Sequence, residues 1–179
     1  MSMTAIEKIL LKHCDKKSIS VGEIIEVTYD MIYSNDNAAP LAIEQFKKLP
    51  CNNVKDASKI AFFCDHNVPN KDINTAENCR IIKKFAKNQG IESFYEGGRT
   101  GIEHIMMPEL GMVSPGDLIM GNDSHTPTLG AIGALAIGFG STDIAAAWAT
   151  GKTWLKVPKT IKLLFEGIPR TWVSGNDLI

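Results

Sequence analysis

Predicted strands and helices alternate along most of this chain, and that alternation limits the possible fold more than any other feature of the sequence. Runs of apolar and β-branched residues indicate strands, whereas apolar residues at helical spacing indicate amphipathic helices. Strands are expected at residues 23–33, 58–64, 91–95, 117–120 and 159–165, and helices at residues 4–13, 38–49, 75–88 and from 141 toward 148. Repeated strand–helix–strand units are typical of a parallel sheet covered by helices. We therefore expect an α/β domain with a mostly parallel sheet flanked by helices.

Residues that favour helix ends support several of these boundaries. Thr75 is expected to cap the helix that begins there, and Gly90 to end it. Ser141 or Thr142 is expected to cap the helix that follows the glycine-rich region. Ser174 is typical of the cap of one more helix, and we expect that helix and the fold to continue beyond Ile179.

Length and charge narrow the class of protein. A chain of 179 residues suits one domain, residues 1–179, with a sizeable core. Its 19 basic and 20 acidic residues leave a net charge of −1, which favours neither nucleic acid nor an anionic membrane as a partner. The longest apolar stretch, residues 130–139, is too short and too rich in glycine to span a bilayer, and the N-terminal residues lack a signal pattern. We expect a cytoplasmic protein.

The cysteines do not indicate a disulfide framework or a thiolate metal site. There are four, and no two of them form a Cys-x-x-Cys pair. Widely spaced cysteines in a cytoplasmic chain are expected to be reduced, and a free cysteine usually behaves as a small buried apolar residue. The four are Cys14, Cys51, Cys64 and Cys79.

Polar side chains gather where two of the predicted strands end. Asp65 and His66 follow the strand at 58–64, and Asp123, Ser124 and His125 follow the strand at 117–120. Because ligands of parallel sheets bind at the carboxyl ends of the strands, both groups are expected at the same edge. A carboxylate beside an imidazole can raise the pKa of the imidazole and make it a general acid. The sequence therefore predicts an acid–base site built from loops.

A third loop adds to this hypothesis. His104 follows the glycine-rich turn at residues 97–101, in which Arg99 is placed to bind a carboxylate or to hold the loop. Each of these side chains is also consistent with a purely structural role, since structural ion pairs shift the pKa of a histidine as readily as active sites do. A mononuclear zinc hydrolase that uses His66, His104 and His125 is an alternative, because such sites combine imidazoles and carboxylates. A non-catalytic binding module is another.

Several separated motifs resemble the aconitase superfamily, in the same order and over nearly the whole chain, from about Thr4 to Ile179. The stretch from Ala149 to Pro158 is similar to the isopropylmalate dehydratase and homoaconitase branch of that family. The other motifs are Asp36-Asn37-Ala38-Ala39, Asp65-His66, Gly101-Ile102-Glu103-His104, Gly121 to Thr126, Gly130-Ala131 and Gly140-Ser141-Thr142-Asp143. The resemblance implies the aconitase-like N-terminal domain and the reversible dehydration of a hydroxy-polycarboxylate, such as isopropylmalate or homocitrate and homoaconitate, in amino-acid biosynthesis.

The family's roles carry over to matching positions. Asp65 and His66 would protonate the departing hydroxyl, and His104 would lie beside a [4Fe–4S] cluster and its bound water. Asp123, Ser124 and His125 would contact iron-bound oxygen and substrate. Asn35 and Asp36 would be substrate-binding, as would Arg99, and Asn35 stands where the isopropylmalate branch often has histidine, which leaves the hydroxyacid open.

The resemblance also implies groups that this chain lacks. The three cysteines that hold the family's cluster lie downstream of the matched region, two of them as Cys-x-x-Cys, and no cysteine here matches them. Four-iron clusters need thiolate ligands, so no metal ligands are expected within this chain. The catalytic base and most substrate-binding arginines come from later domains or from a separate small subunit. We expect a truncated, inactive N-terminal portion of a large subunit that pairs with a small subunit.

Overall fold

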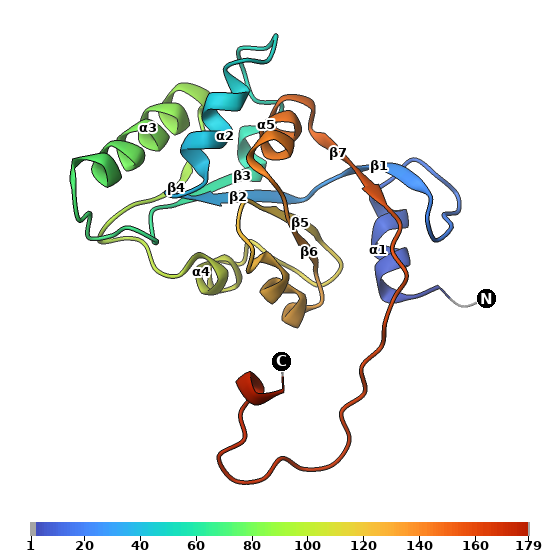
Figure 1. Cartoon of the computed structure of the whole chain (residues 1–179). Helices are drawn as coiled ribbons and strands as arrows, with labels where there is room; N and C mark the ends of the chain where they lie inside the picture. The colour runs from blue at the N-terminus through green and yellow to red at the C-terminus, as the bar shows by residue number, and fades with distance from the viewer. Residues whose placement is uncertain (1–2, 179) are drawn as a thin grey trace.

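A parallel sheet of five strands forms the centre of the computed structural model, which describes residues 3–178 (Figure 1). All of its strand pairs are parallel, so the carboxyl ends of the strands meet at one edge. This confirms the predicted α/β class. The strand order is β4 (Ser93–Tyr95), β3 (Ile60–Phe63), β2 (Met31–Asn35), β5 (Leu118–Gly121) and β6 (Leu135–Gly138).

Helices cover both faces of this sheet. Neighbouring strand residues point to opposite sides, and every residue of β3 and β5 is buried, so both faces need a covering layer. On one face, α2 (Ala39–Phe46), α3 (Ile73–Gln89) and α5 (Ser141–Thr150) form the larger core, where the Trp148 ring packs against Phe46, Phe62 and Phe85. On the other face, α4 (Glu103–Glu109) and a 3₁₀ segment (Thr126–Ile132) bury Met107 and Leu129. Figure 1 shows the two helical layers on either side of the sheet.

A smaller antiparallel sheet lies beside the central one. It pairs β1 (Ile24–Thr28) with β7 (Lys152–Lys156), next to α1 (Ala5–Lys12). The predicted single strand at 23–33 is therefore wrong, since it is divided between two sheets. The break falls at Tyr29 and Asp30: the Tyr29 hydroxyl donates to the Ala147 carbonyl (2.9 Å), and the Asp30 carboxylate lies 2.6 Å from the ring of the buried His13 and accepts from the Leu118 backbone N–H.

The strand predicted at 159–165 is also wrong. Residues 158–174 have no regular structure, and the strand in this part of the chain is β7, earlier in the sequence. Among the described residues, the structure also contains elements that the sequence pattern did not indicate, including α4, the 3₁₀ segment and β6.

Two of the predicted helix caps are wrong and two are supported. Asp72 caps α3, and its carboxylate accepts from the Thr75 N–H (2.8 Å), so Thr75 lies inside the helix. The N-cap of α5 is Gly140, without a side-chain hydrogen bond, in place of Ser141 or Thr142. Gly90 ends α3 at φ 70°, as expected. Ser174 caps a short 3₁₀ turn, Gly175–Asp177, whereas the prediction for Ile179 lies outside the described residues. None of the described helices is long and apolar enough to cross a membrane.

Candidate active site

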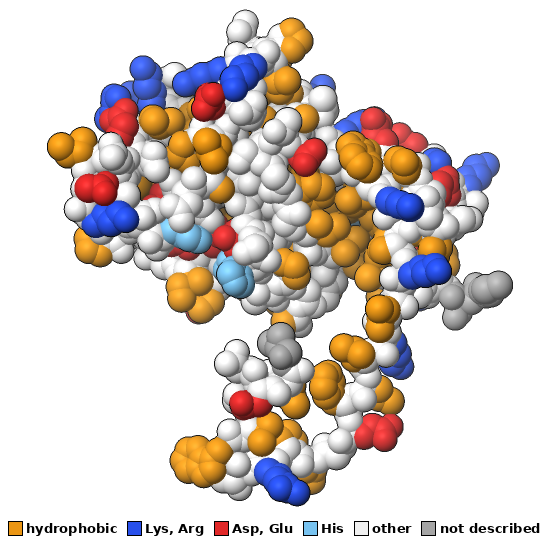
Figure 2. All heavy atoms as spheres, in the orientation of Figure 1, with side chains coloured by type: hydrophobic (Ala, Val, Ile, Leu, Met, Phe, Trp, Pro, Cys, Tyr) orange, Lys and Arg blue, Asp and Glu red, His pale blue; other side chains and the backbone are white. Residues whose placement is uncertain are grey.

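The carboxyl edge of the central sheet brings together the loops that the sequence singled out. His66 follows β3, Asp123 follows β5, and Asn35 is the last residue of β2, which lies between those two strands. The His66 Nε2 atom lies 3.5 Å from an Asp123 carboxylate oxygen. In Figure 2, pale-blue histidine and red carboxylate side chains lie together on the surface shown. The prediction that these two loops meet at one edge is confirmed.

Asp36 shapes the loop that carries His66. It is fully buried, and its carboxylate accepts backbone N–H groups from Asp65 (3.2 Å), His66 (2.9 Å) and Asn67 (2.9 Å). These bonds turn the chain after β3, so that Asp65 and His66 face each other where adjacent residues of a strand would point apart. Because both oxygens of Asp36 are occupied by the loop, the structure gives this residue a positioning task; its substrate-binding role stays a prediction.

The Asp65–His66 pair is the most directly coupled acid–base unit of the site. The His66 Nδ1 atom lies 2.7 Å from an Asp65 carboxylate oxygen. Burial alone would lower the pKa of His66, but the hydrogen bond that its ring donates to Asp65 and the negative charges of Asp65, Glu103 and Asp123 raise the pKa above the ordinary value. His66 thus carries a proton at higher pH than a free histidine, with Nε2 turned toward Asp123.

Glu103 belongs to the same cluster, although it was not among the predicted site residues. Its side chain is fully buried and accepts a hydrogen bond from the Asn35 amide (3.0 Å), while its backbone N–H donates to Asp65 (2.8 Å). Burial, together with the charges of Asp65 and Asp123, raises the pKa of Glu103 to about 8. Its Oε2 atom has no hydrogen-bond partner among the described residues. The helical spacing of Glu103 and Met107, both buried in α4, was the signal that could have revealed it.

His104 is held between Tyr33 and Asp123. The Tyr33 hydroxyl lies 2.9 Å from Nδ1, and an Asp123 carboxylate oxygen lies 3.0 Å from Nε2. Burial lowers the pKa of His104, with the charge of Asp123 opposing that shift, and burial raises the pKa of Tyr33. A protonated phenol therefore donates to Nδ1, which leaves the Nε2–H of a neutral imidazole facing Asp123. Tyr33 was also not among the predicted site residues, because a tyrosine in an apolar strand is expected to pack in the core.

Asp123 links the histidines to one another. Burial alone would raise its pKa, but the backbone N–H of His125 (2.7 Å) and the charges of His104, His66 and His125 lower it. Asp123 therefore stays ionised to a lower pH than a free aspartate does. It also borders an open hollow of about 480 Å³ whose walls include Ser124 and Phe139.

Ser124 and His125 form the exposed rim of the site, and Arg99 stays outside it. The His125 ring is 77% exposed, with Nδ1 3.3 Å from Asp123 and 3.3 Å from the Ser124 hydroxyl. Arg99 is exposed in the loop after β4, and its guanidinium forms no hydrogen bond or ion pair with the described residues of the cluster. Of the predicted residues, the structure brings together Asn35, Asp36, Asp65, His66, His104, Asp123, Ser124 and His125.

Three sets of described side chains in this cluster could hold a divalent cation. Each presents ligand atoms within 4.8 Å of one another, and the sets are His104, Asp123 and His125; His66, Glu103 and Asp123; and Asp36, Asp65 and His66. The three histidines do not form one such group among the described residues, so a site with three imidazole ligands does not fit. A site with two imidazoles and one carboxylate does.

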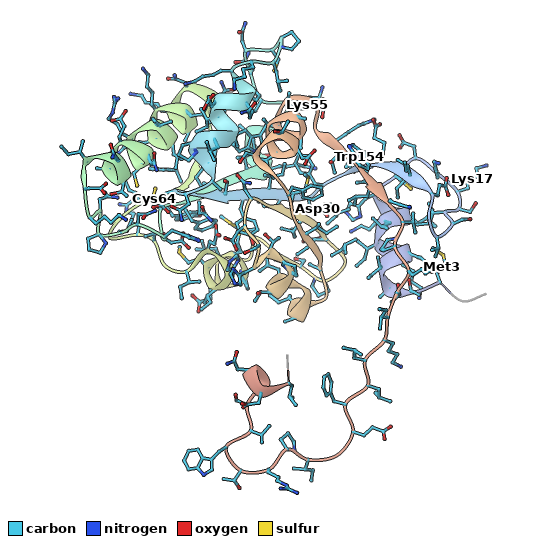
Figure 3. The ribbon with its side chains drawn as sticks, viewed as in Figure 1. Met3, Lys17, Asp30, Lys55, Cys64 and Trp154 are labelled. Atoms are coloured by element: carbon cyan, nitrogen blue, oxygen red, sulfur yellow. The ribbon has the colours of Figure 1, made fainter. Side chains whose placement is uncertain are left out.

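The cysteines do not fit a four-iron cluster. Cys64 is buried where β3 ends (Figure 3), next to Cys79, and burial raises the pKa of its thiol, which disfavours the thiolate that iron requires. No cysteine joins the potential metal-binding groups found among the described residues.

Comparison with known proteins gives a consistent result. The profile of the aconitase family (aconitate hydratase) matches residues 7–179. The chain is 50% identical over 179 residues to 3-isopropylmalate dehydratase large subunit 1 of Pyrococcus abyssi, which covers all of this chain and 42% of that protein. It is 51% identical over 179 residues to the 3-isopropylmalate dehydratase large subunit of Thermodesulfovibrio yellowstonii, with the same coverage of 100% and 42%. The chain thus spans less than half the length of these curated relatives.

Proposed function

Since the chain belongs to the aconitase family, we propose that it forms part of the large subunit of a 3-isopropylmalate dehydratase, a hydro-lyase that removes and returns water on a hydroxy-polycarboxylate. The observation that supports this proposal is the Asp65–His66 pair at the carboxyl edge of the sheet, with Nε2 of a readily protonated imidazole turned toward the Asp123 carboxylate. Such a group can give a proton to a departing hydroxyl and take it back in the reverse reaction.

The other residues of the cluster position this acid. In our proposal Asp65 keeps the proton of His66 on Nδ1 and stabilises the charged ring, while Asn35 and Glu103 fix the loops around it. Ser124 and His125, exposed at the rim, contact the substrate carboxylates. Asp123, hydrogen-bonded to His104, is placed to accept a hydrogen bond from a water at the centre of the cluster. A substrate-binding role for Arg99 stays part of the proposal, since this residue is exposed in the loop after β4.

A cofactor and a partner complete the proposal. The described cysteines do not fit as ligands, so we propose that thiolates from outside this chain hold a [4Fe–4S] cluster beside His104 and Asp123. The relatives are named as large subunits, and we propose a small subunit as the partner of this one.

The native polypeptide that carries this sequence would test the proposal. It should be purified without air, and its intact mass, iron and sulfide measured together with the interconversion of isopropylmalate isomers. We expect a mass well above the 19.6 kDa of this chain, bound iron and sulfide, and turnover. If the protein carries its cluster and its small subunit but does not turn over isopropylmalate, the proposed substrate is wrong. Homoaconitate would then be assayed. A mass of 19.6 kDa without iron would overturn the enzyme assignment.

A mononuclear metal site is the second candidate, because His104, Asp123 and His125 fit a cation. It predicts that this chain alone binds one zinc ion tightly, and that His125→Ala abolishes the binding. Calorimetric titration with zinc distinguishes the two candidates, since the dehydratase proposal does not require a stoichiometric zinc ion.

A further inference from the structure

The segment after β7 exposes more apolar surface than an isolated chain normally does. Each residue from 158 to 178 is exposed. Figure 1 shows this segment as the red stretch that runs away from the body, and Figure 2 shows orange side chains along it. Its large apolar side chains are Ile161 (84% exposed), Leu163 (75%), Leu164 (69%), Phe165 (65%), Ile168 (95%) and Trp172 (96%). An exposed apolar stretch of this size marks an interaction surface.

The order of these residues fits a β-strand with one apolar face. In an extended backbone, Ile161, Leu163 and Phe165 point to one side. Lys162, Leu164 and Glu166 point to the other, so one face is wholly apolar and the other is mixed. This pattern is the reason that a strand is predicted at 159–165. Within the described part of the chain, residues 158–169 make no backbone hydrogen bond, and the Thr160 hydroxyl contact with Thr4 (3.3 Å) is the link to the body. The segment has the sequence of a strand but no neighbouring strand between residues 3 and 178.

The relatives indicate where such a neighbour would come from. The family profile extends through this segment to residue 179, and the match to the Pyrococcus abyssi protein includes all 179 residues. The Pyrococcus abyssi protein therefore has a counterpart of this segment. Because the match covers 42% of that protein, the larger part of its polypeptide lies outside the match. An unpaired strand with an apolar face joins the free edge of a sheet through backbone hydrogen bonds, with its apolar side chains against the core of that sheet.

We propose that residues 159–166 add as a β-strand to a sheet in the part of the large subunit that lies outside the region matched here, with Ile161, Leu163 and Phe165 against the core of that sheet. The mixed face, on which Leu164 lies between Lys162 and Glu166, remains toward water. The segment is thus the connection through which this domain docks to the rest of the large subunit. This inference rests on the proposal that the chain is part of a large subunit, but it concerns assembly, and its test does not measure turnover.

Hydrogen exchange with and without the missing part tests the proposal. The chain is co-expressed with the unmatched remainder of the Pyrococcus abyssi large subunit and, in a second version, joined to it in one polypeptide. We expect the two parts to co-purify, and the amides of residues 159–166 to exchange at least on the order of tenfold more slowly than in the chain alone. Unchanged exchange in both versions would overturn the proposal. Protection that develops in the chain alone as it dimerises would overturn it in favour of a second copy.

Matched variants test which face is buried. Leu163→Lys with Phe165→Lys should prevent co-purification and protection. Thr160→Lys with Leu164→Lys adds the same charge to the opposite face and should preserve both. If the two double variants behave alike, the assignment of the buried face is wrong. All of these residues are exposed in the chain alone, so the substitutions should not unfold its body.

Discussion

Asp65 holds the Nδ1 atom of His66 at 2.7 Å, and this contact sets how readily the ring accepts a proton. Asp65→Asn keeps the shape of the side chain but removes its charge, so the pKa of His66 should fall. In the proposed dehydratase we expect kcat to drop by about 10- to 100-fold, with a smaller change in KM. Steady-state kinetics across a pH series would measure both values. A change confined to KM would contradict the proposed acid role.

The chain provides a matched control for this substitution. Asp30 and the buried His13 form a similar pair at 2.6 Å, beside the junction of the two sheets and outside the cluster. Asp30→Asn should lower the stability of the fold and leave kcat near that of the unsubstituted enzyme. An equal loss of kcat in the two variants would show that the Asp65 effect comes from the fold.

Glu103 predicts a pH-dependent stability. Its pKa is raised from 4.5 to about 8, so the folded state binds a proton more tightly than the unfolded state. The stability from this group is fully present below about pH 4.5 and is lost as the pH rises through about 8. Glu103→Gln mimics the protonated acid and cannot titrate. Between pH 5 and 9, urea unfolding should show that the original chain loses a few kcal/mol more than the variant. Parallel pH curves for the two proteins would contradict a raised pKa.

How far the site could be predicted differs from residue to residue. Asp65, His66, Asp123 and His125 stand out in the sequence because polar groups follow apolar strands directly, and the parallel sheet brings their loops to one edge. Glu103 could not be identified in that way. Its importance comes from complete burial against Asn35, and burial depends on how α4 packs on the sheet.

At the scale of elements, the backbone of β6 at Gly138 lies very close to the backbone of the loop that carries Asp123. A Cβ atom on Gly138 would lie 2.6 Å from the Asp123 carbonyl oxygen, which is backbone and cannot rotate away. Gly138→Ala should therefore displace the loop, lower the unfolding free energy by about 1–3 kcal/mol and reduce turnover of the complete enzyme. Gly130→Ala is the control, because a Cβ atom there meets nothing within 4 Å. Chemical denaturation of both variants would check this, and equal stabilities would contradict it.

The elements that were predicted correctly carry their own local signals. β3 is an apolar run, and α3 ends at a glycine with positive φ. The cap of α3 was misplaced because Asp72 and Thr75 bond reciprocally, and either residue suits a helix start. β1 and β7 depend on a pairing between Ile24 and Lys156, far apart in the sequence, and the register of such a pair is not visible in either strand alone. The strand predicted at 159–165 has the local pattern but no partner among the described residues.

At the scale of the whole molecule, the body and the C-terminal segment contribute very differently to stability. The last buried residue of the described chain is Val157, and the residues after it are exposed up to 178. We predict that the body folds as one cooperative unit without them. A chain of residues 1–157 should have an unfolding free energy within about 0.5 kcal/mol of the full chain, because exposed residues with few contacts contribute little. Its solubility should rise, since the large apolar side chains of the segment are removed.

A shorter truncation provides the contrast. A chain of residues 1–151 also loses β7, which leaves Ile25 and Val27 of β1 without their paired strand and removes the buried Val157. It should be less stable than residues 1–157 by about 3 kcal/mol or more, since a strand pair and part of the core are lost together. Urea unfolding of the three chains, monitored by circular dichroism, would measure these differences in unfolding free energy. If removing residues 158–179 proves as costly as removing β7, the segment belongs to the folded body, and docking to another part of the protein would not explain its exposed apolar face.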